Sequence, residues 1–207
     1  MNATSSTPSK HRELHAVVIG PGRIGCGFAG DVLAAAGYRL TFVGRGAAIR
    51  ALWQAGRYTV RLVDGPRATE REIGGIRALE ASDPRAAEAI ATADVIAVSV
   101  GTAGLPGIAP LLAEGLRRRT TPVNILAFEN EPEAAAILRR EVLARWPAAA
   151  EHGFSGALVS RIVTRRTGDP ERGEPIVFVG DPASSFVVHA PSLRAPLAII
   201  PGLQLVE

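Results

Sequence analysis

Short hydrophobic runs alternate with amphipathic stretches along most of the chain. Residues 14–19 form an apolar run that stops at Gly20, which is the pattern of a buried parallel strand. Residues 23–36 then place apolar side chains toward one side of a helix, and Gly37 ends that helix. Downstream, strands are expected at 40–43, 95–100 and 123–128, and helices at 47–54, 83–91, 105–118 and 131–146. This order predicts a doubly wound, mostly parallel α/β sheet.

Two regions depart from the alternation. Residues 58–63 and roughly 70–79 form a polar, alternating excursion that we interpret as a hairpin. Short strands are expected at 156–163 and 175–179, with arginine- and glycine-rich loops between them. The prolines of 190–202 exclude a regular long helix there. We therefore expect a small β-containing extension that begins near residue 150.

A glycine-rich turn joins the first strand to the first helix. Gly20-Pro21-Gly22-Arg23-Ile24-Gly25 has the G-x-G-x-x-G spacing of a dinucleotide-binding turn. Gly20 would permit a tight turn, Gly22 would let the backbone approach a pyrophosphate, and Gly25 would allow close helix–strand packing. The helix N-terminus offers amides and a positive dipole end to phosphates. An ordinary glycine-rich turn is the alternative, but the strand before and the helix after favour a Rossmann-like NAD(P)-binding fold over residues 14–207.

The end of the second strand bears on the choice of dinucleotide. NAD-specific folds place a carboxylate there to hold the ribose 2′-hydroxyl, whereas this strand is followed by Gly44-Arg45-Gly46. Gly44 removes charge repulsion, and Arg45 can pair with a 2′-phosphate through charge-assisted hydrogen bonds. We predict NADP as the cofactor and leave NAD open, because Arg45 could also be a solvated loop arginine.

Composition limits the remaining chemistry. The chain has 207 residues, 47% hydrophobic and 21% charged, which suits one domain with a proper core. Lys10 is the only lysine among 23 basic residues, and it precedes the first strand, away from the expected site. Cys26 is the only cysteine, so no intrachain disulfide can form. We interpret Cys26 as a small packed residue, although a thiolate could be stabilised at a helix start.

Other functional classes lack support in the sequence. The net charge is only +3, the longest basic run is 117–119, and the few aromatic residues are not interleaved with basic ones, so nucleic-acid binding is not expected. The histidines and the single cysteine lack metal-ligand spacing. No segment approaches the roughly 20 apolar residues of a membrane span. Residues 1–13 are rich in Ser, Thr and Pro, which predicts a disordered lead-in rather than a signal peptide, and hence a cytoplasmic protein.

Several segments resemble a particular enzyme family more closely than the G-x-G-x-x-G motif alone would. They are 20–28 (GPGRIGCGF), 98–101 (VSVG), 124–130 (NILAFEN), 153–154 (GF), 159–163 (VSRIV) and 200–203 (IPGL). In this order, along nearly the whole chain, they resemble the N-terminal half of mannitol-1-phosphate 5-dehydrogenases and related polyol-specific long-chain dehydrogenases. The resemblance implies hydride transfer between a secondary alcohol and NAD(P), with a polyol or sugar phosphate as substrate.

The resemblance also implies roles for individual residues. It places Val100 and Gly101 at the nicotinamide side of the cofactor, and it makes Asn130 the donor that stabilises the substrate oxyanion. Asn130 could instead cap the following helix. Arg161 could contact an anionic substrate such as a sugar phosphate, and a structural ion pair is an equal alternative.

Departures from the family pattern leave the activity open. The family's aspartate after the second strand is Gly44 here, and its aspartate before Arg-Ile-Val is Ser160. In the family a lysine general base lies in a helical domain after the IPG segment, and we expect that domain to be absent from this chain. The apolar end at 197–206 then predicts contact with that domain or a partner subunit. A non-catalytic NADP(H)-binding module and an enzyme with reassigned chemistry remain alternatives.

Overall fold

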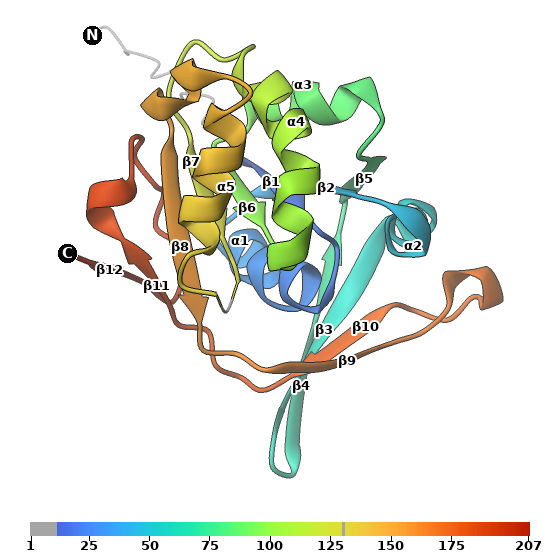
Figure 1. The fold of residues 1–207 in the computed structure, drawn as a ribbon. Coiled ribbons are helices and arrows are strands. Elements are labelled where there is room, and N and C mark those ends of the chain that lie inside the picture. The colour runs from blue at the N-terminus through green and yellow to red at the C-terminus, as the bar shows by residue number, and fades with distance from the viewer. Residues whose placement is uncertain (1–11, 130) are drawn as a thin grey trace, which may run out of the picture.

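An eight-stranded sheet forms the centre of the molecule (Figure 1). The structure is a computed structural model that describes residues 12–129 and 131–207. The strand order is β12-β11-β8-β7-β6-β1-β2-β5. The bounds are β1 (His15–Ile19), β2 (Arg39–Gly44), β5 (Arg77–Glu80), β6 (Val95–Val98), β7 (Asn124–Ala127), β8 (Gly153–Val159), β11 (Phe186–His189) and β12 (Leu203–Val206). Every neighbouring pair is parallel except β8 with β11, so the predicted mostly parallel α/β sheet is confirmed.

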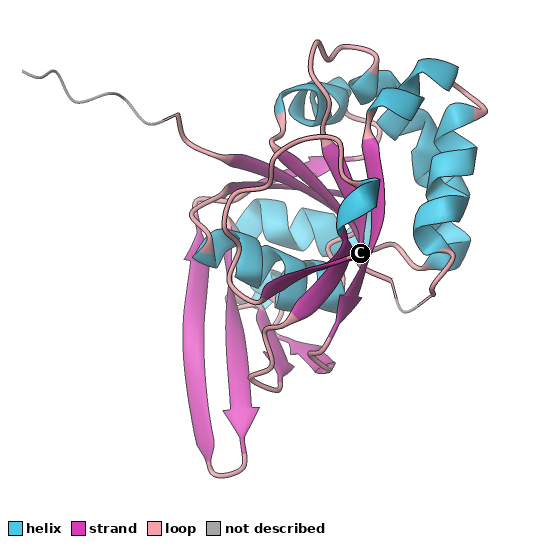
Figure 2. Cartoon of the chain, turned by 90° about the vertical axis from the view of Figure 1, so that its left-hand side faces the viewer, coloured by secondary structure: helices cyan, strands magenta, loops and turns pink. Residues whose placement is uncertain are grey.

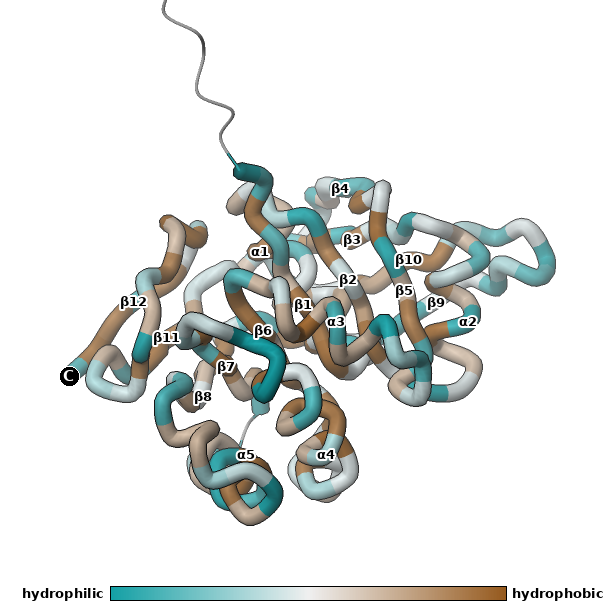
Figure 3. The backbone as a smooth tube through the Cα atoms, turned by 90° about the horizontal axis from the view of Figure 1, so that it is seen from above, coloured by the Kyte–Doolittle hydropathy of each residue, from teal (hydrophilic) through white to brown (hydrophobic). Residues whose placement is uncertain are grey.

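Helices cover both faces of this sheet. One face carries a π-helical turn η1 (Gly25–Gly30) continued by α1 (Asp31–Ala35), together with α2 (Gly46–Ala55). The other face carries α3 (Pro84–Thr92), α4 (Leu105–Leu116) and α5 (Ala134–Leu143). Seen from above, the row of strands separates α1 from α4 and α5 (Figure 3). Short 3₁₀ turns complete the helical elements: η2 (Thr102–Gly104), η3 (Pro147–Glu151), η4 (Pro170–Arg172) and η5 (Ala190–Ser192).

The central strands of the sheet are apolar on both sides because helices cover both sides. All five residues of β1 are buried, as expected for the central strand of a parallel sheet. Val17 and Ile19 pack in the core beneath α3, α4 and α5, whereas Ala16 and Val18 pack in the core beneath α1 and α2. The central strands thus present their ends, rather than their faces, to solvent, whereas β12 at the edge of the sheet is largely exposed.

A second, four-stranded sheet packs against the first helix (Figure 2). Its order is β4-β3-β10-β9, with β3 (Arg57–Asp64), β4 (Arg67–Gly74), β9 (Val163–Thr167) and β10 (Val177–Gly180). Tyr58 of β3 lies edge-on to Phe178 of β10 at 5.6 Å and to Phe42 of β2 at 5.7 Å between ring centroids. These aromatic contacts join the second sheet to the central one, and the β3–β4 hairpin projects away from the body of the molecule.

Several element boundaries differ from the expectations. The hairpin is present, but 70–79 belongs to two strands, because Gly75, with φ of +65°, turns the chain between β4 and β5. The expected strand 156–163 likewise divides into β8 of the main sheet and β9 of the second. The short strands β11 and β12, at one end of the main sheet, were not predicted. The β content expected after residue 150 is confirmed, and it is shared between both sheets.

No helix among residues 12–129 and 131–207 is both long enough and apolar enough to cross a membrane. Residues 1–11, which hold Lys10 and most of the predicted lead-in, lie outside the described residues, as does Asn130.

Candidate dinucleotide site

The carboxyl ends of β1, β2, β6 and β7 meet at one edge of the main sheet, and the glycine-rich turn lies there. Gly20 ends β1 with φ of +101°, and its amide donates to Val43 O at 2.9 Å. A Cβ on Gly20 would lie 2.1 Å from Ser99 O, at the end of β6. Neither the backbone conformation nor the space allows a side chain, so the turn can sit between β2 and β6 only with glycine.

The other two glycines of the motif differ in the space around them: Gly25 is closely packed and Gly22 is open. A Cβ on Gly25 would lie 1.9 Å from Gly20 O, so the helix approaches the strand as closely as backbone permits. Gly22 is exposed, and a Cβ there would meet nothing within 4 Å. The turn is therefore closed where it packs and open where a ligand would approach, as a pyrophosphate-binding turn requires. Binding by these residues stays a prediction.

The three residues between the motif glycines, Pro21, Arg23 and Ile24, make different contacts. Pro21 is buried, and its ring lies against Gly44 of β2. Arg23 is exposed, and its Nη1 donates to Thr164 O of β9 at 3.2 Å. Ile24 is half-buried and packs on the core beneath α1. Arg23 thus joins the turn to the second sheet.

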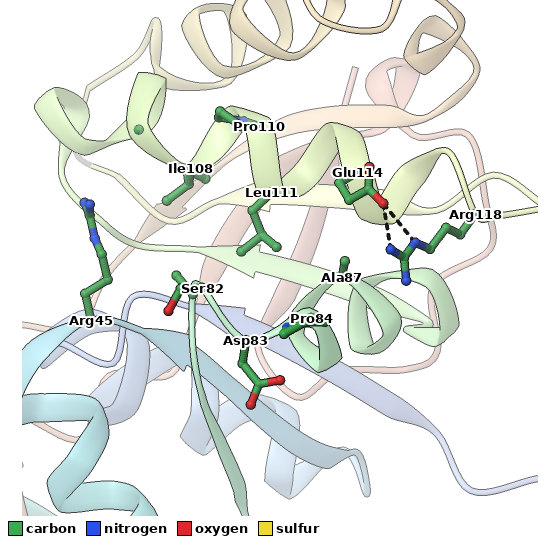
Figure 4. A pocket seen from close by; sticks show the side chains of 12 residues that line it. Arg45, Ser82, Asp83, Pro84, Ala87, Ile108, Pro110, Leu111, Glu114 and Arg118 are labelled. Carbon is green, nitrogen blue, oxygen red and sulfur yellow. Dashed lines mark hydrogen bonds and ion pairs between the residues drawn. The ribbon is translucent and has the colours of Figure 1, made fainter.

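A cavity of about 520 Å³ opens at the carboxyl end of β2, next to Arg45 (Figure 4). Its lining comes from Arg45 after β2, from the 81–83 loop and the start of α3, and from α4 and the residues just after it. Ile108 and Leu111 give it an apolar side, and the Glu114–Arg118 ion pair lies at one end. Cavities of this kind, mostly apolar with a few polar groups, are typical of small-molecule sites.

Arg45 is the basic residue at the opposite end of this cavity (Figure 4). It is exposed, and it makes no side-chain hydrogen bond or ion pair with residues 12–129 or 131–207. By contrast, Arg118 at the other end of the cavity is held by Glu114 at 2.6 Å. An arginine that no protein carboxylate neutralises is suited to bind an anion.

The loops after β6 and β7 are joined by a carboxylate. The amide of Gly101, which has φ of +77°, donates to Oε1 of Glu129 at 2.8 Å. Burial raises the pKa of Glu129, and the amides of Gly101 and Val100 oppose that shift. Glu129 was not predicted as a site residue, although its position directly after a buried strand could have indicated one. Asn130, the predicted oxyanion donor, lies outside the described residues.

Arg161 lies in a buried network rather than on an open surface. Its side chain is 1% exposed, and Nη1 donates to Asp31 Oδ2 at 2.7 Å and to Gly27 O at 2.8 Å. Nε donates to Ala183 O at 2.7 Å, and the guanidinium lies 5.2 Å from the centroid of the Phe28 ring. The structural ion pair is thus present, and Arg161 has no exposed surface with which to contact a sugar phosphate.

Asp31 extends this hydrogen-bond network to the β3–β4 hairpin. Its other carboxylate oxygen, Oδ1, accepts from Arg71 Nη1 of the hairpin at 2.9 Å. The carboxylate therefore ties the helix that follows the glycine-rich turn both to the β3–β4 hairpin and to the segment after β8. The hydroxyl of Ser160 donates to Ser185 O at 2.7 Å.

Cys26 is buried at the start of the first helix, and burial raises the pKa of its thiol. This environment disfavours a reactive thiolate and agrees with a packing role. Among the residues that the structure describes, no three His, Cys, Asp or Glu side chains gather as a metal site would require.

Comparison with known proteins identifies the family. The family model "Mannitol dehydrogenase Rossmann domain" matches residues 14–198. The chain therefore belongs to the mannitol dehydrogenase family. It is 33% identical over 206 residues to a mannitol-1-phosphate 5-dehydrogenase of Geobacillus thermodenitrificans, covering 93% of this chain and 52% of that protein. The corresponding enzyme of Exiguobacterium sibiricum is 35% identical over 199 residues, covering 93% and 51%.

Solved structures show the same fold. A mannitol 2-dehydrogenase of Pseudomonas fluorescens, in a ternary complex with NAD and D-mannitol, aligns with a TM-score of 0.73 at 16% identity. That alignment covers 98% of this chain and 54% of the other. An octopine dehydrogenase in complex with NADH and agmatine aligns with a TM-score of 0.64 at 14% identity. The chain thus spans about half the length of the curated mannitol dehydrogenase relatives that it matches.

Proposed function

We propose that this Rossmann domain binds NADP in preference to NAD and forms the cofactor-binding half of a polyol or sugar-phosphate dehydrogenase. The observation that carries the proposal is the glycine-rich turn, closed at Gly20 and Gly25 and open at Gly22. Pro21 of this turn lies against Gly44, and the next residue, Arg45, lines a cavity. Family membership supplies the reaction class: hydride transfer between a secondary alcohol and the nicotinamide.

The described residues fit a dinucleotide. The open backbone at Gly22 would take the pyrophosphate, and the cavity between Arg45 and α4 would take the adenosine end. Val100 and Gly101 would lie at the nicotinamide end, with Asn130 as the proposed oxyanion donor. When bound, the nicotinamide accepts or returns the hydride, and the residues of this chain hold and orient it.

Two features favour a 2′-phosphate. Position 44, where an NAD-specific fold would present a carboxylate, has no side chain. Arg45 follows with a guanidinium that no described side chain neutralises, and α2 begins at the next residue. The first amides of a helix have no intrahelical partner and favour anions. Together these groups supply the positive end of an NADP site.

Titration of the chain with NADP and NAD by calorimetry tests the proposal. We expect NADP to bind more tightly, and Arg45→Ala to weaken NADP binding by about tenfold to a hundredfold while NAD binding changes little. Arg140→Ala, which removes an exposed arginine of α5 away from the cavity, is the matched control. Equal affinities of the wild-type chain for NADP and NAD, or no effect of Arg45→Ala, would contradict the NADP assignment.

The catalytic base is proposed to come from a further domain or partner subunit. Four apolar side chains near the C-terminal edge are strongly exposed: Leu158 at 63%, Ile162 at 69%, Ile199 at 95% and Leu205 at 55%. The strand registers place Leu158 opposite Val187 and Leu205 opposite Val188, on the two faces of the sheet. Exposed apolar residues such as these are available for contact with another domain or subunit. We expect the 207-residue chain to bind NADP without turning over mannitol, mannitol 1-phosphate or other polyols. Turnover by this chain would contradict the proposal that its base lies elsewhere.

Ser160 supports a second candidate, an NADP(H)-binding domain with altered or no chemistry. The family pattern has a carboxylate there, and here the hydroxyl donates to Ser185 O instead. The two candidate functions can be separated by adding, as a second chain, the half of a relative that this chain does not match. Only the dehydrogenase proposal predicts that this addition produces turnover. We keep cytoplasmic localisation, and the absence of a nucleic-acid partner, as parts of the proposal.

A further inference from the structure

Position 44 has no room for a side chain, and the obstacle is the glycine-rich turn itself. A Cβ on Gly44 would lie 2.5 Å from Cδ and 2.8 Å from Cγ of Pro21. The next nearest atom, Ile49 Cβ, is 3.6 Å away, so the conflict is with the proline ring alone. The φ of Gly44 is not in the positive region, and an L-residue could adopt its backbone if the ring were absent.

Neither partner in this contact can yield easily. Gly44 is held in β2 between β1 and β5, and its carbonyl accepts from the amide of Ala81 at 2.7 Å. The Pro21 ring is closed onto its own backbone nitrogen, so it cannot rotate away as a flexible side chain would. The residue before it, Gly20, is fixed against Ser99.

We infer that Pro21 is a specificity-determining residue: its ring keeps position 44 free of a side chain and so excludes the carboxylate that would select NAD. The inference rests on the proposed dinucleotide site and deepens it. Arg45 attracts the 2′-phosphate of NADP, and Pro21 prevents position 44 from carrying a carboxylate that would repel this phosphate. A change of cofactor preference at position 44 therefore needs two substitutions, with Pro21 replaced first.

A thermal double-mutant cycle tests the contact without any ligand. The variants are Gly44→Ala, Pro21→Ala and the two combined, with the melting temperature followed by circular dichroism. Gly44→Ala is expected to lower Tm by about 5 °C in the wild-type background, because overpacking at a rigid contact is destabilising. In the Pro21→Ala background, which lacks both Cγ and Cδ, the same change is expected to shift Tm by less than about 2 °C.

The control is Gly74→Ala at the end of β4, where the nearest atom to a new Cβ is 3.9 Å away. Its effect on Tm should be small and the same in both backgrounds. An equal loss of Tm from Gly44→Ala in both backgrounds, or no loss in either, would overturn the inference. Failure of the combined Pro21→Ala/Gly44→Ala variant to fold, when Pro21→Ala alone folds, would overturn it too, because removal of the proline ring is expected to relieve the conflict.

Cofactor titration then tests specificity. Gly44→Asp alone is expected to weaken the binding of both NADPH and NADH, because the new side chain would displace Pro21 and the glycine-rich turn. Pro21→Ala/Gly44→Asp is expected to shift the NADH-to-NADPH affinity ratio toward NADH by at least about tenfold. An equal shift from Gly44→Asp alone overturns the inference and leaves the proposed function intact. A wild-type chain that binds neither dinucleotide rejects the proposed function, while the thermal cycle still decides whether Pro21 blocks position 44.

Discussion

Replacing Arg161 with methionine removes the guanidinium from the buried network beside the glycine-rich turn. The side chains of Arg161 and Asp31 are 1% and 3% exposed, and the guanidinium donates to Asp31 Oδ2, Gly27 O and Ala183 O. The substitution leaves two carbonyls without this donor and a buried carboxylate with only Arg71, whose side chain is half-exposed. Methionine keeps much of the apolar contact with Phe28, so the change isolates the polar loss.

The expected loss follows from these numbers. Breaking a buried ion pair by removing one partner costs about 3–5 kcal/mol, because a charge is left without compensation. For a chain of this size that corresponds to a fall in Tm of roughly 6–20 °C. Retention of Arg71 by Asp31 places the expectation near the lower end, at about 3 kcal/mol.

Urea unfolding followed by circular dichroism measures this loss through the midpoint and slope. Arg118→Met is the matched control, because its ion pair with Glu114 joins side chains that are 43% and 49% exposed and is worth at most about 0.5 kcal/mol. Arg161→Met/Asp31→Asn should recover part of the loss, since no buried charge remains. A loss below about 1 kcal/mol for Arg161→Met would refute the structural role and reopen a role in substrate binding.

Three further outcomes are expected. Gly25→Ala should strongly destabilise the fold, since its Cβ would lie 1.9 Å from Gly20 O, whereas Gly22→Ala should leave Tm unchanged and weaken dinucleotide binding. Cys26 should react with a thiol reagent only after denaturation, because the thiol is buried and burial raises its pKa. Burial lowers the pKa of His15 below 6.5, so the unfolded chain binds more protons and stability should fall as pH drops through and below about 6.5. Thermal unfolding of His15→Gln across pH 5–7.5 should show a shallower slope than wild type.

Each of these three predictions would be contradicted by a specific result. Unchanged dinucleotide affinity in Gly22→Ala would mean that the open backbone does not face the ligand. Rapid labelling of Cys26 in the native chain would contradict its packing. Parallel pH profiles for wild type and His15→Gln would show that His15 does not titrate differently in the folded and unfolded states. The nearby charges of Arg39, Arg77 and Asp94 are present in both proteins and cancel in that comparison.

The glycine-rich turn and the parallel sheet could be predicted because their causes are local. Gly20, Gly22 and Gly25 act through spacing along the chain, and each buried strand is a short apolar run. The second sheet was harder to predict, since β3 pairs with β10 across more than a hundred residues. A polar hairpin and a short apolar strand carry no sign in the sequence that they are neighbours.

The same limit explains why the sequence left two roles open for Arg161 and did not single out Glu129. The sequence neighbours of Arg161 allow a surface position as readily as an ion pair, but its environment is set by Asp31, 130 positions away. Glu129 acquires its role from the amide of Gly101, 28 positions away. Pro21 was predicted only as part of the dinucleotide-binding motif, and its contact with Gly44 is seen only in the fold.

The pairing of β3 with β10 sets an order for folding. The β3–β4 hairpin is complete by residue 74, yet the edge of β3 that receives β10 stays open until residues 177–180 have left the ribosome. During synthesis the nascent chain thus carries an unsatisfied strand edge, and Tyr58 lacks its contact with Phe178, for about a hundred residues. An open strand edge can pair with other chains. The charges of the hairpin, with Glu70, Arg71 and Glu72 in succession, oppose the aggregation of that intermediate.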